Sequence, residues 1–356
     1  MNKMLTLFVL GSLCAAYITA CTPAPMPTTV IEISNATQLA SIVMDGKYKL
    51  TQDISVTNWT PIGNAGNPFT GEFDGNGHMV VITSFSNVEN AFEGIAYYGL
   101  FGYIKGGKVQ RLLVGNTSLH VPTNNTLQFG GIVGCLEGGS IAQCVVSGNM
   151  EGRSNGSNRS CLVGGIAGNV FGGGSITDCC TYAIHRLSNV SGSGNVTAIA
   201  GGIAGSLFSG TIQRCYARGA ARAYVPHPDA PTYTAYSGGI VGFIGAQESG
   251  VIRKLTHCVV LDMEISTSSS VVNDHRVVGG ITSDTGNLTC ANNYAPSSIV
   301  VLGTLSPNNG TAITDAQLKD ANWWQTSIGW SSSIWDFSVV PTTRYPYMKN
   351  IMGMVL

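Results

Sequence analysis

Hydrophobic and polar residues alternate along most of the chain in short runs of three to six positions. The run from Ile141 to Val146 is typical, because β-branched Ile and Val dominate it, as they do in half-buried β-strands. Glycine pairs interrupt the runs at regular distances. No segment between them has the apolar periodicity, sustained over about 10–12 residues, that marks a helix. The pattern therefore predicts an all-β fold of many short strands.

The glycine pairs belong to a tandem repeat. Its clear copies are Gly130–Gly134, Gly164–Gly168, Gly201–Gly205 and Gly238–Gly242, with degenerate copies at Gly99–Gly102 and Gly279–Thr282. Successive copies begin 31, 34, 37, 37 and 41 residues apart, and each is followed by a second arm such as Gly139-Ser140-Ile141. One such unit cannot bury its apolar face, whereas stacked units share a continuous core. We therefore expect a parallel β-helix or solenoid of Gly-rich repeats. A β-propeller is the main alternative, but the aromatic signatures and longer strands of propeller blades are missing.

Short capping helices are predicted at both ends of the solenoid, where open strand edges would otherwise pair with other chains. Asn35 precedes the amphipathic segment 36–43, and Thr314 to Gln317 forms a capping box that opens a helix through Asp320. Beyond it lie Trp323, Trp324, Trp330, Trp335 and Phe337. We interpret these aromatic residues as a hydrophobic lid over the last coil, with a sugar-binding platform as the alternative.

The N-terminus has the features of an export signal. Lys3 precedes the apolar stretch Leu5–Leu13, which is too short to span a bilayer. The following Ile18-Thr19-Ala20-Cys21 resembles a bacterial lipobox, which implies that Cys21 carries the lipid; cleavage near Ala20 as an ordinary secretory signal is the alternative. A Pro-rich run follows Cys21 and is typical of an extended tether. The expected segments are a lipoprotein signal peptide at 1–20, a tether at 21–30, the solenoid with its N-terminal cap at 31–302, and a Trp-rich cap at 303–356.

Composition narrows the function. Charged residues make up 10% of the 356 residues and the formal net charge is −1, so there is no basic field for nucleic acid. Glycine contributes 46 residues, as expected where many tight turns are needed. We expect no cofactor and no nucleic-acid partner.

The repeat arms resemble the GLUG motif of bacterial surface proteins, adhesin-like proteins and the non-catalytic parts of some immunoglobulin A proteases. The segments Trp59–Gly63 and Phe69–His78, together with Trp335 and Tyr345–Tyr347, are similar to the usual flanks of such repeats. The resemblance covers about residues 31–350 and implies a right-handed β-helix-like fold. It implies no particular activity, because a repeat and not a site defines the family.

Eight cysteines remain beyond Cys21. Cys144, Cys179 and Cys215 each follow a repeat isoleucine by three residues, so we expect them to stack as buried reduced thiols. Disulfides that involve Cys161, Cys180, Cys258 or Cys290 stay open as an alternative, and metal binding is disfavoured because no Cys-x-x-Cys pair is present.

Other candidate chemistry is weak. Asp74 and His78 could form an acid–base pair, but Asp74-Gly75-Asn76-Gly77 also has the dipeptides of a tight turn. The acidic residues of the repeat fall at different offsets, and only Asp262 and Glu264 share a strand face. No His-Glu-x-x-His motif is present, so metalloprotease chemistry is not carried over from GLUG-bearing proteins.

These observations favour a non-enzymatic lipoprotein of the cell envelope, held at the outer membrane by its lipid, whose solenoid serves adhesion or binds a host glycan or matrix protein. The residues expected to bind lie in the insertion around 225–236 and are Tyr224, Tyr233 and Tyr236. A polysaccharide lyase or glycoside hydrolase on the same scaffold is one alternative, and a structural component of a surface complex is another. An enzyme of that kind would need two carboxylates about 5–10 Å apart in an open groove.

Overall fold

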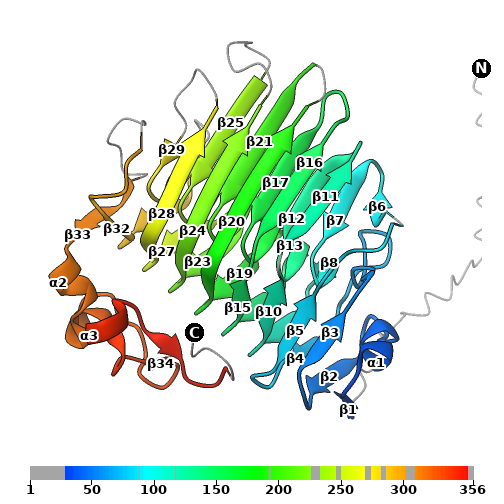
Figure 1. The fold of residues 1–356 in the computed structure, drawn as a ribbon, viewed down its shortest axis with the longest axis horizontal. Helices are drawn as coiled ribbons and strands as arrows, with labels where there is room; N and C mark the ends of the chain where they lie inside the picture. The colour runs from blue at the N-terminus through cyan, green and yellow to red at the C-terminus, as the bar shows by residue number, and fades with distance from the viewer. Residues whose placement is uncertain are drawn as a thin grey trace, which may run out of the picture.

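The protein is a mostly β, parallel β-solenoid of about six turns with a few short helices, as seen in a computed structural model (Figure 1). The structure describes residues 29–351 except 88, 117, 192–193, 226–232, 246–249, 269–273, 282–285 and 302–308. The predicted fold class is therefore confirmed. Among the described residues, no helix is long and apolar enough to cross a membrane.

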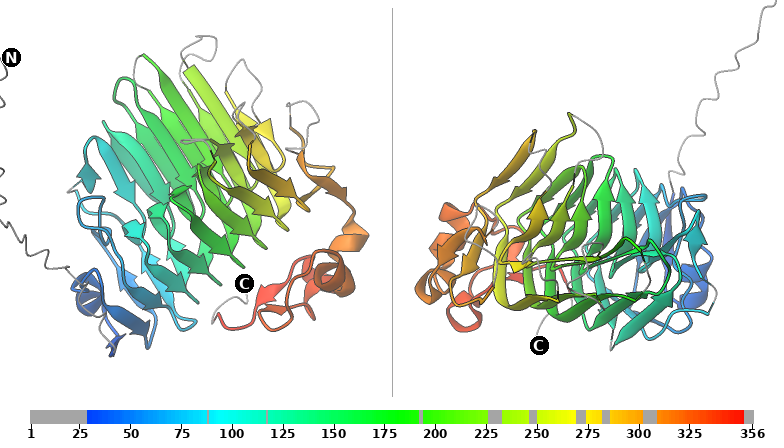
Figure 2. Two further views of the ribbon diagram at one scale, coloured as in Figure 1. Left: turned by 180° about the vertical axis from the view of Figure 1, so that it is seen from behind. Right: turned by 90° about the horizontal axis from the view of Figure 1, so that it is seen from above.

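Four sheets run along the solenoid, and the strands of successive coils pair in parallel within each of them (Figure 2). The first two coils each add two strands to the eleven-stranded sheet, and the short β6 (Ala91–Phe92) at the edge of the seven-stranded sheet is antiparallel. The nine-stranded sheet contains β1 (Val30–Ile33), β2 (Lys47–Leu50), β4 (Glu72–Asp74), β9 (Lys108–Gln110), β14 (Ser140–Ala142), β19 (Gly174–Thr177), β23 (Gly210–Gln213), β27 (Arg253–Thr256) and β31 (Leu288–Ala291). The eleven-stranded sheet contains β3 (Ile54–Val56), β5 (Met79–Ile82), β10 (Leu113–Asn116), β11 (Leu119–Thr123), β15 (Val145–Ser147), β16 (Met150–Ser154), β20 (Cys180–Val190), β24 (Tyr216–Tyr224), β28 (Val259–Thr267), β32 (Tyr294–Pro296) and β33 (Thr311–Ile313).

The other two sheets complete each coil. The seven-stranded sheet contains β6 (Ala91–Phe92), β7 (Ile95–Tyr98), β12 (Thr126–Gly130), β17 (Ser160–Gly164), β21 (Val196–Gly201), β25 (Tyr233–Gly238) and β29 (Asp274–His275). The six-stranded sheet contains β8 (Phe101–Lys105), β13 (Val133–Glu137), β18 (Ala167–Phe171), β22 (Ala204–Leu207), β26 (Val241–Ile244) and β30 (Val278–Ile281). Coil 1 runs from β7 to β11, coil 2 from β12 to β16, coil 3 from β17 to β20, coil 4 from β21 to β24, coil 5 from β25 to β28 and coil 6 from β29 to β32.

Side chains of one kind stack inside the solenoid because the coils are in register. One row of the core contains Val109, Ile141, Ile176, Ile212 and Leu255, all fully or almost fully buried. The first four are second-arm residues of the repeat, so the alternation in the sequence is the alternation between the core and the outer face. In the fifth coil the predicted arm Gly250-Val251-Ile252 was wrong by three residues, because Leu255 takes the core position and Ile252 is 67% exposed.

The glycines of the repeat permit close contact between backbones of neighbouring strands. A Cβ atom on Gly168 would lie 2.5 Å from the backbone nitrogen of Phe129 and 2.6 Å from the carbonyl oxygen of Gly134. A Cβ atom on Gly202 would lie 1.8 Å from the carbonyl oxygen of Gly239 in the next coil. Glycines at these repeat positions are thus a stacking requirement, because any side chain would hold the neighbouring coil away.

The last coil differs at this position. Gly238 pairs with His275 and Phe243 pairs with Gly280, which places the last copy of the repeat at His275–Gly279. The sequence alignment that began this copy at Gly279 was therefore wrong by four residues. His275 and Arg276 replace the glycine pair at the end of the stack, and the Arg276 amide donates to the Asn309 side chain at 2.8 Å.

A sharp corner joins the nine-stranded to the eleven-stranded sheet in every coil. The corner residues have positive φ although none is glycine: Arg111 at 50°, Gln143 at 54°, Asp178 at 52°, Arg214 at 52°, His257 at 59° and Asn292 at 55°. Such a left-handed conformation costs about 1–2 kcal/mol for a non-glycine residue. Contacts between neighbouring corners offset part of that cost, and the Arg214 guanidinium holds the Asp178 carboxylate with two bonds of 2.7 Å.

The two predicted helices form, although shorter than expected. Helix α1 (Ala36–Ala40) is capped by Asn35, whose side chain accepts from the Gln38 amide at 2.9 Å. Helix α2 (Asp315–Leu318) begins at the predicted capping box of Thr314 and Gln317. It is followed by a π-helical turn (Trp323–Ser327), the antiparallel pair β34 (Trp335–Asp336) and β35 (Tyr347–Met348), and α3 (Val340–Thr343).

Residues 314–351, here called the C-terminal strap, do not form the expected lid over the last coil. Instead the strap runs back across the outer face of the eleven-stranded sheet toward the first coils (Figures 1 and 2). It covers a row of outward side chains in continuous register, here called the apolar row: Met79, Leu113, Val145, Cys180, Tyr216, Val259 and Tyr294. A row of apolar side chains on an outer face needs a cover, and the tryptophans supply it.

Candidate binding groove

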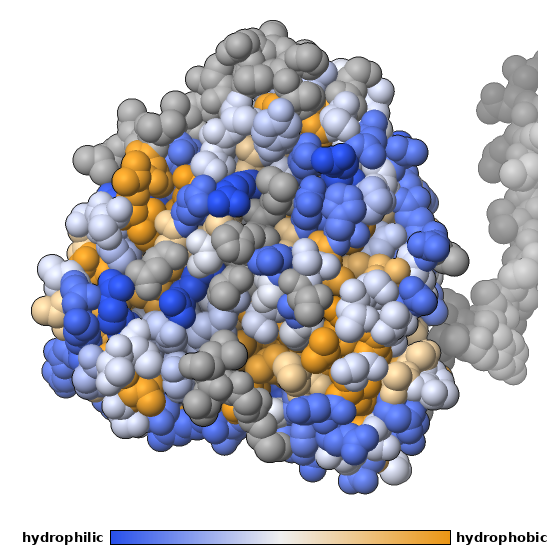
Figure 3. Space-filling model, viewed as in Figure 1, coloured by the Kyte–Doolittle hydropathy of each residue, from blue (hydrophilic) through white to orange (hydrophobic). Residues whose placement is uncertain are grey.

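Beyond the strap, the outer face of the eleven-stranded sheet is open and polar. The part built from β11, β16 and the second halves of β20, β24 and β28 carries outward side chains that we call the polar face: His120, Glu151, Arg153, Arg222 and Tyr224. Figure 3 shows hydrophilic side chains gathered in this region, over β11 and β16. Inward residues of the same strands, such as Val121 and Ala223, belong to the core. The strict alternation leaves the polar side chains for solvent or a ligand.

Charges on the polar face are paired with one another. His120 Nδ1 lies 3.3 Å from the Glu151 carboxylate, and the Arg153 guanidinium lies 3.9 Å from it. Arg222 holds Glu264 through two hydrogen bonds, one of them 2.9 Å long. Exposed pairs of this kind contribute little to stability, so a ligand can replace one of their partners at small cost.

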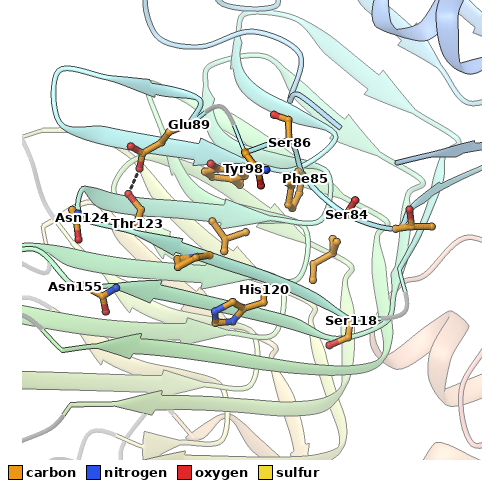
Figure 4. Close-up of a pocket in the computed structure, with 15 residues that line it drawn as sticks. Ser84, Phe85, Ser86, Glu89, Tyr98, Ser118, His120, Thr123, Asn124 and Asn155 are labelled. Atoms are coloured by element: carbon orange, nitrogen blue, oxygen red, sulfur yellow. Dashed lines mark hydrogen bonds between the residues drawn. The ribbon is translucent and has the colours of Figure 1, made fainter. Parts of the chain in front are cut away.

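A groove of about 530 Å³ borders the polar face on the side of the first coil (Figure 4). Its lining is mostly polar and consists of Thr83, Ser84, Phe85, Ser86, Asn87, Glu89, Tyr98, Ser118, Leu119, His120, Val121, Pro122, Thr123, Asn124 and Asn155. The volume lies within the range of about 300–1,000 Å³ that is usual for ligand pockets. Sequence reasoning missed this groove, because residues 83–89 carry no repeat signal.

The two walls of the groove come from different parts of the chain. Figure 4 shows Ser84, Ser86 and Glu89 along one side and Ser118, His120 and Asn124 along the other. The Thr123 hydroxyl donates to the Glu89 carboxylate and links the walls at one end. The Phe85 ring lies edge-on to Tyr98, with ring centroids 5.0 Å apart, and contributes an apolar surface between the walls. Burial, with the Glu89 charge second, raises the pKa of Tyr98.

The three predicted tyrosines do not form one site. Tyr224 is 47% exposed and lies on the polar face, in register with Arg153 through the intervening Asn189. Tyr233 packs against the core, and the Tyr236 ring lies 4.8 Å from that of Phe243 on another sheet. Most of the insertion between Tyr224 and Tyr233 lies outside the described residues. Of the three, only Tyr224 belongs to the surface that contains the groove.

The segment from Asp74 to His78 forms a turn rather than a catalytic pair. Asn76 and Gly77 have positive φ, and the Asn76 amide donates to Asp74 Oδ1 at 2.8 Å. Arg111 holds the Asp74 carboxylate, whereas His78 Nδ1 lies 3.2 Å from Asp53. The turn interpretation accounts for the local hydrogen bonds.

The cysteine ladder forms as predicted and is longer than expected. All eight cysteines beyond residue 28 are free thiols in the structure, and Cys144, Cys179, Cys215 and Cys258 follow successive corners into the core. Burial raises the pKa of Cys179 and Cys258 well above the usual value. Asn293 ends the ladder, because its side chain donates to the Leu255 carbonyl at 2.9 Å and accepts from the Cys258 amide at 3.1 Å.

Neither acidic nor metal-binding clusters mark a reaction centre in the described part of the chain. No group of three or more His, Cys, Asp or Glu side chains that could hold a metal ion occurs there. Glu264 is engaged by Arg222, and the side chain of Asp262 lies outside the described residues. Cys21, the predicted site of lipid attachment, also lies outside them.

The fold and the groove define a parallel β-solenoid protein with an open polar face. No protein-family model and no curated protein matches the chain, so the GLUG resemblance stays a prediction based on its motif residues. The structure is similar to the crystal structure of a Bacteroides ovatus protein provisionally described as an immunoglobulin A1 protease. That similarity has 20% sequence identity and a TM-score of 0.61, and it covers 89% of this chain and 91% of the other. At this identity the likeness concerns the fold alone.

Proposed function

We propose that the protein is a non-enzymatic binding protein of the cell envelope, anchored through a lipid on Cys21, whose polar face and groove bind a glycan or protein ligand. The observation that carries the proposal is the groove itself, an open, polar-lined surface beside side chains whose charges are only loosely paired. The lipobox resemblance at Ile18–Cys21 and the Pro-rich tether support display at the outer membrane.

The groove favours binding over polysaccharide cleavage. Glycosidases act through two carboxylates that flank the scissile bond. Among the residues that line the groove, Glu89 is the only carboxylate, and it accepts a hydrogen bond from Thr123. The proposal of a hydrolase or lyase therefore has no comparable support at this surface.

Binding is tested with the lipidated protein in mild detergent, screened against arrayed glycans and immobilised matrix proteins. Tyr224→Ala and Arg153→Ala should weaken binding at least several-fold, whereas Thr289→Ala, an exposed change on the nine-stranded sheet, should leave it unchanged. Equal binding by all three variants would place the ligand elsewhere. The anchor is tested by labelling cells with palmitate, since Cys21→Ser should abolish incorporation.

A further inference from the structure

Strand β11 has one unpaired edge. It pairs with β16 on one side, and no strand among the described residues pairs with its other side. Two hydrogen bonds fix its orientation: the Leu119 amide donates to the Asn149 carbonyl at 2.9 Å, and the Thr123 carbonyl accepts from the Asn155 amide at 2.8 Å. In a parallel ladder, alternate residues direct both backbone groups to the same side. The backbone groups of His120 and Pro122 therefore face away from β16.

The groove lies along this free edge. In later coils, the corresponding position beside each strand holds the strand of the preceding coil, as β11 lies beside β16 and β16 beside β20. After β5 the chain instead continues to pair with the segment that follows β3, where Phe85 forms a bridge with Trp59, and none of its described residues forms a strand beside β11. The Thr83 amide donates to the Val56 carbonyl and the Ser86 amide to the Trp59 carbonyl, both at 2.9 Å. The groove is thus the place where one strand of the eleven-stranded sheet is missing.

We propose that this groove binds an extended peptide segment of a partner protein, which adds to β11 as a further strand. The inference rests on the proposed binding function and narrows its ligand from glycan or protein to an extended peptide. Strand addition derives its affinity from main-chain hydrogen bonds and its specificity from pockets for alternate side chains. The free edge offers the amide of His120 and the carbonyls of His120 and Pro122 for those bonds.

The lining indicates which peptide fits. The Phe85 ring, beside Tyr98, offers an apolar contact to a side chain that points into the molecule. Glu89 has no cationic partner among the described residues, so it favours a Lys or Arg near the Thr123 end of the groove. Pro122 has no amide, which leaves the edge richer in acceptors than in donors and discourages pairing between two copies of this edge.

The test begins with a phage-displayed library of random heptapeptides, panned against the lipidated protein in detergent. The tightest peptide is then resynthesised with single N-methyl groups, one at each backbone amide in turn. Strand addition predicts alternation: methylation at the amides that face β11 should weaken binding about fivefold to tenfold each, and methylation at the amides between them should have little effect.

Variants of His120 provide the matching test on the protein. His120→Pro removes the amide that faces the groove, at an edge position where proline is tolerated, and should lower affinity by a similar factor. His120→Ala removes the side chain and keeps that amide, so the affinity that His120→Pro loses beyond His120→Ala measures the backbone hydrogen bond alone. Thermal unfolding shows whether His120→Pro remains folded. If it does not, the peptide methylation series alone tests strand addition to β11.

The outcomes separate this inference from the proposed function. Alternation in the methylation series supports strand addition at β11. Peptide binding without alternation, or binding of arrayed glycans without any peptide, overturns the inference and leaves the binding function in place. If neither glycans, matrix proteins nor peptides bind, both proposals fail.

Discussion

Trp335 should be the residue on which docking of the C-terminal strap depends most. Its side chain is fully buried, its ring lies 4.7 Å from that of Trp330 and 5.7 Å from that of Tyr216, and its Nε1 donates to Asp178 at 3.4 Å. Burial of about 150–250 Å² at about 25 cal/mol per Å² amounts to about 4–6 kcal/mol. Measured costs of Trp→Ala in cores are about 3–5 kcal/mol. We expect Trp335→Ala to destabilise the docked strap by about 3–5 kcal/mol.

The assay uses the distribution of tryptophans. Four of the five lie in the strap and the fifth, Trp59, lies near the first coil, so fluorescence reports mainly on the strap while far-ultraviolet circular dichroism reports on the strands. In urea, Trp335→Ala should shift the fluorescence transition to lower concentration and ahead of the circular dichroism transition. Trp335→Phe keeps most of the packing and should cost less, about 1–2 kcal/mol, because it loses the hydrogen bond to Asp178 and only part of the ring contact.

Val300→Ala serves as the control, because Val300 is 79% exposed and its truncation should change stability by less than about 0.5 kcal/mol. If Trp335→Ala shifts the fluorescence midpoint no more than this control does, the strap is not held by its tryptophans and the reasoning is wrong.

Three further predictions concern the solenoid. Gly168→Ala should destabilise it by several kcal/mol, because the new methyl group would meet the backbone of Phe129 and Gly134. Gly115→Ala is the control and should have a mild effect, because its nearest contact is the flexible Met79 side chain at 3.3 Å. Equal unfolding midpoints for the two variants would refute the stacking role of glycine. The seven buried cysteines beyond Cys21 should react with a thiol reagent only after denaturation, whereas the half-buried Cys290 should react more readily. The same total of eight thiols in the denatured protein with and without reductant would exclude disulfides. Burial lowers the folded-state pKa of His257 and His275. The unfolded chain therefore takes up protons first as the pH falls below about 6.5. The free energy of unfolding should decline between that pH and the lower folded-state pKa values. His257→Asn should reduce that decline in urea titrations at pH 7.5 and 5, and an unchanged decline would exclude His257 as its source.

The coil architecture could be predicted because the features that specify it are local and repeated. Glycine pairs mark places where backbones touch, and a cysteine three residues beyond a core isoleucine must share its register. The place of Cys258 in the ladder was not predicted, because the residue three positions before it is Leu255 and not isoleucine. The last repeat was misaligned because His275 and Arg276 occupy the glycine positions, which only a terminal coil permits.

The candidate site was harder to predict, for a physical reason. The groove exists because the chain after β5 pairs with the segment after β3 and, in its described residues, forms no strand beside β11, and this change of course has no periodic signal. The course of the strap was missed because the apolar row resembles a core row in sequence: Val145 points outward and Val146 inward, and the two look alike in a continuous apolar run. Only the register of neighbouring strands distinguishes the two faces.

The strap changes how the molecule should respond to force and heat. In a plain solenoid each coil touches only its neighbours, so the stack can open from either end one coil at a time. Here Trp330 donates to the His257 carbonyl at 3.0 Å in coil 5, Trp335 reaches Asp178 in coil 3, and the Pro346 carbonyl accepts from the Tyr216 hydroxyl at 3.1 Å in coil 4. These contacts fasten coils 3, 4 and 5 to one segment and convert three nearest-neighbour units into one cooperative block. A load applied along the stack would then be shared by several coils at once, and unzipping from the last coil would first have to peel the strap away.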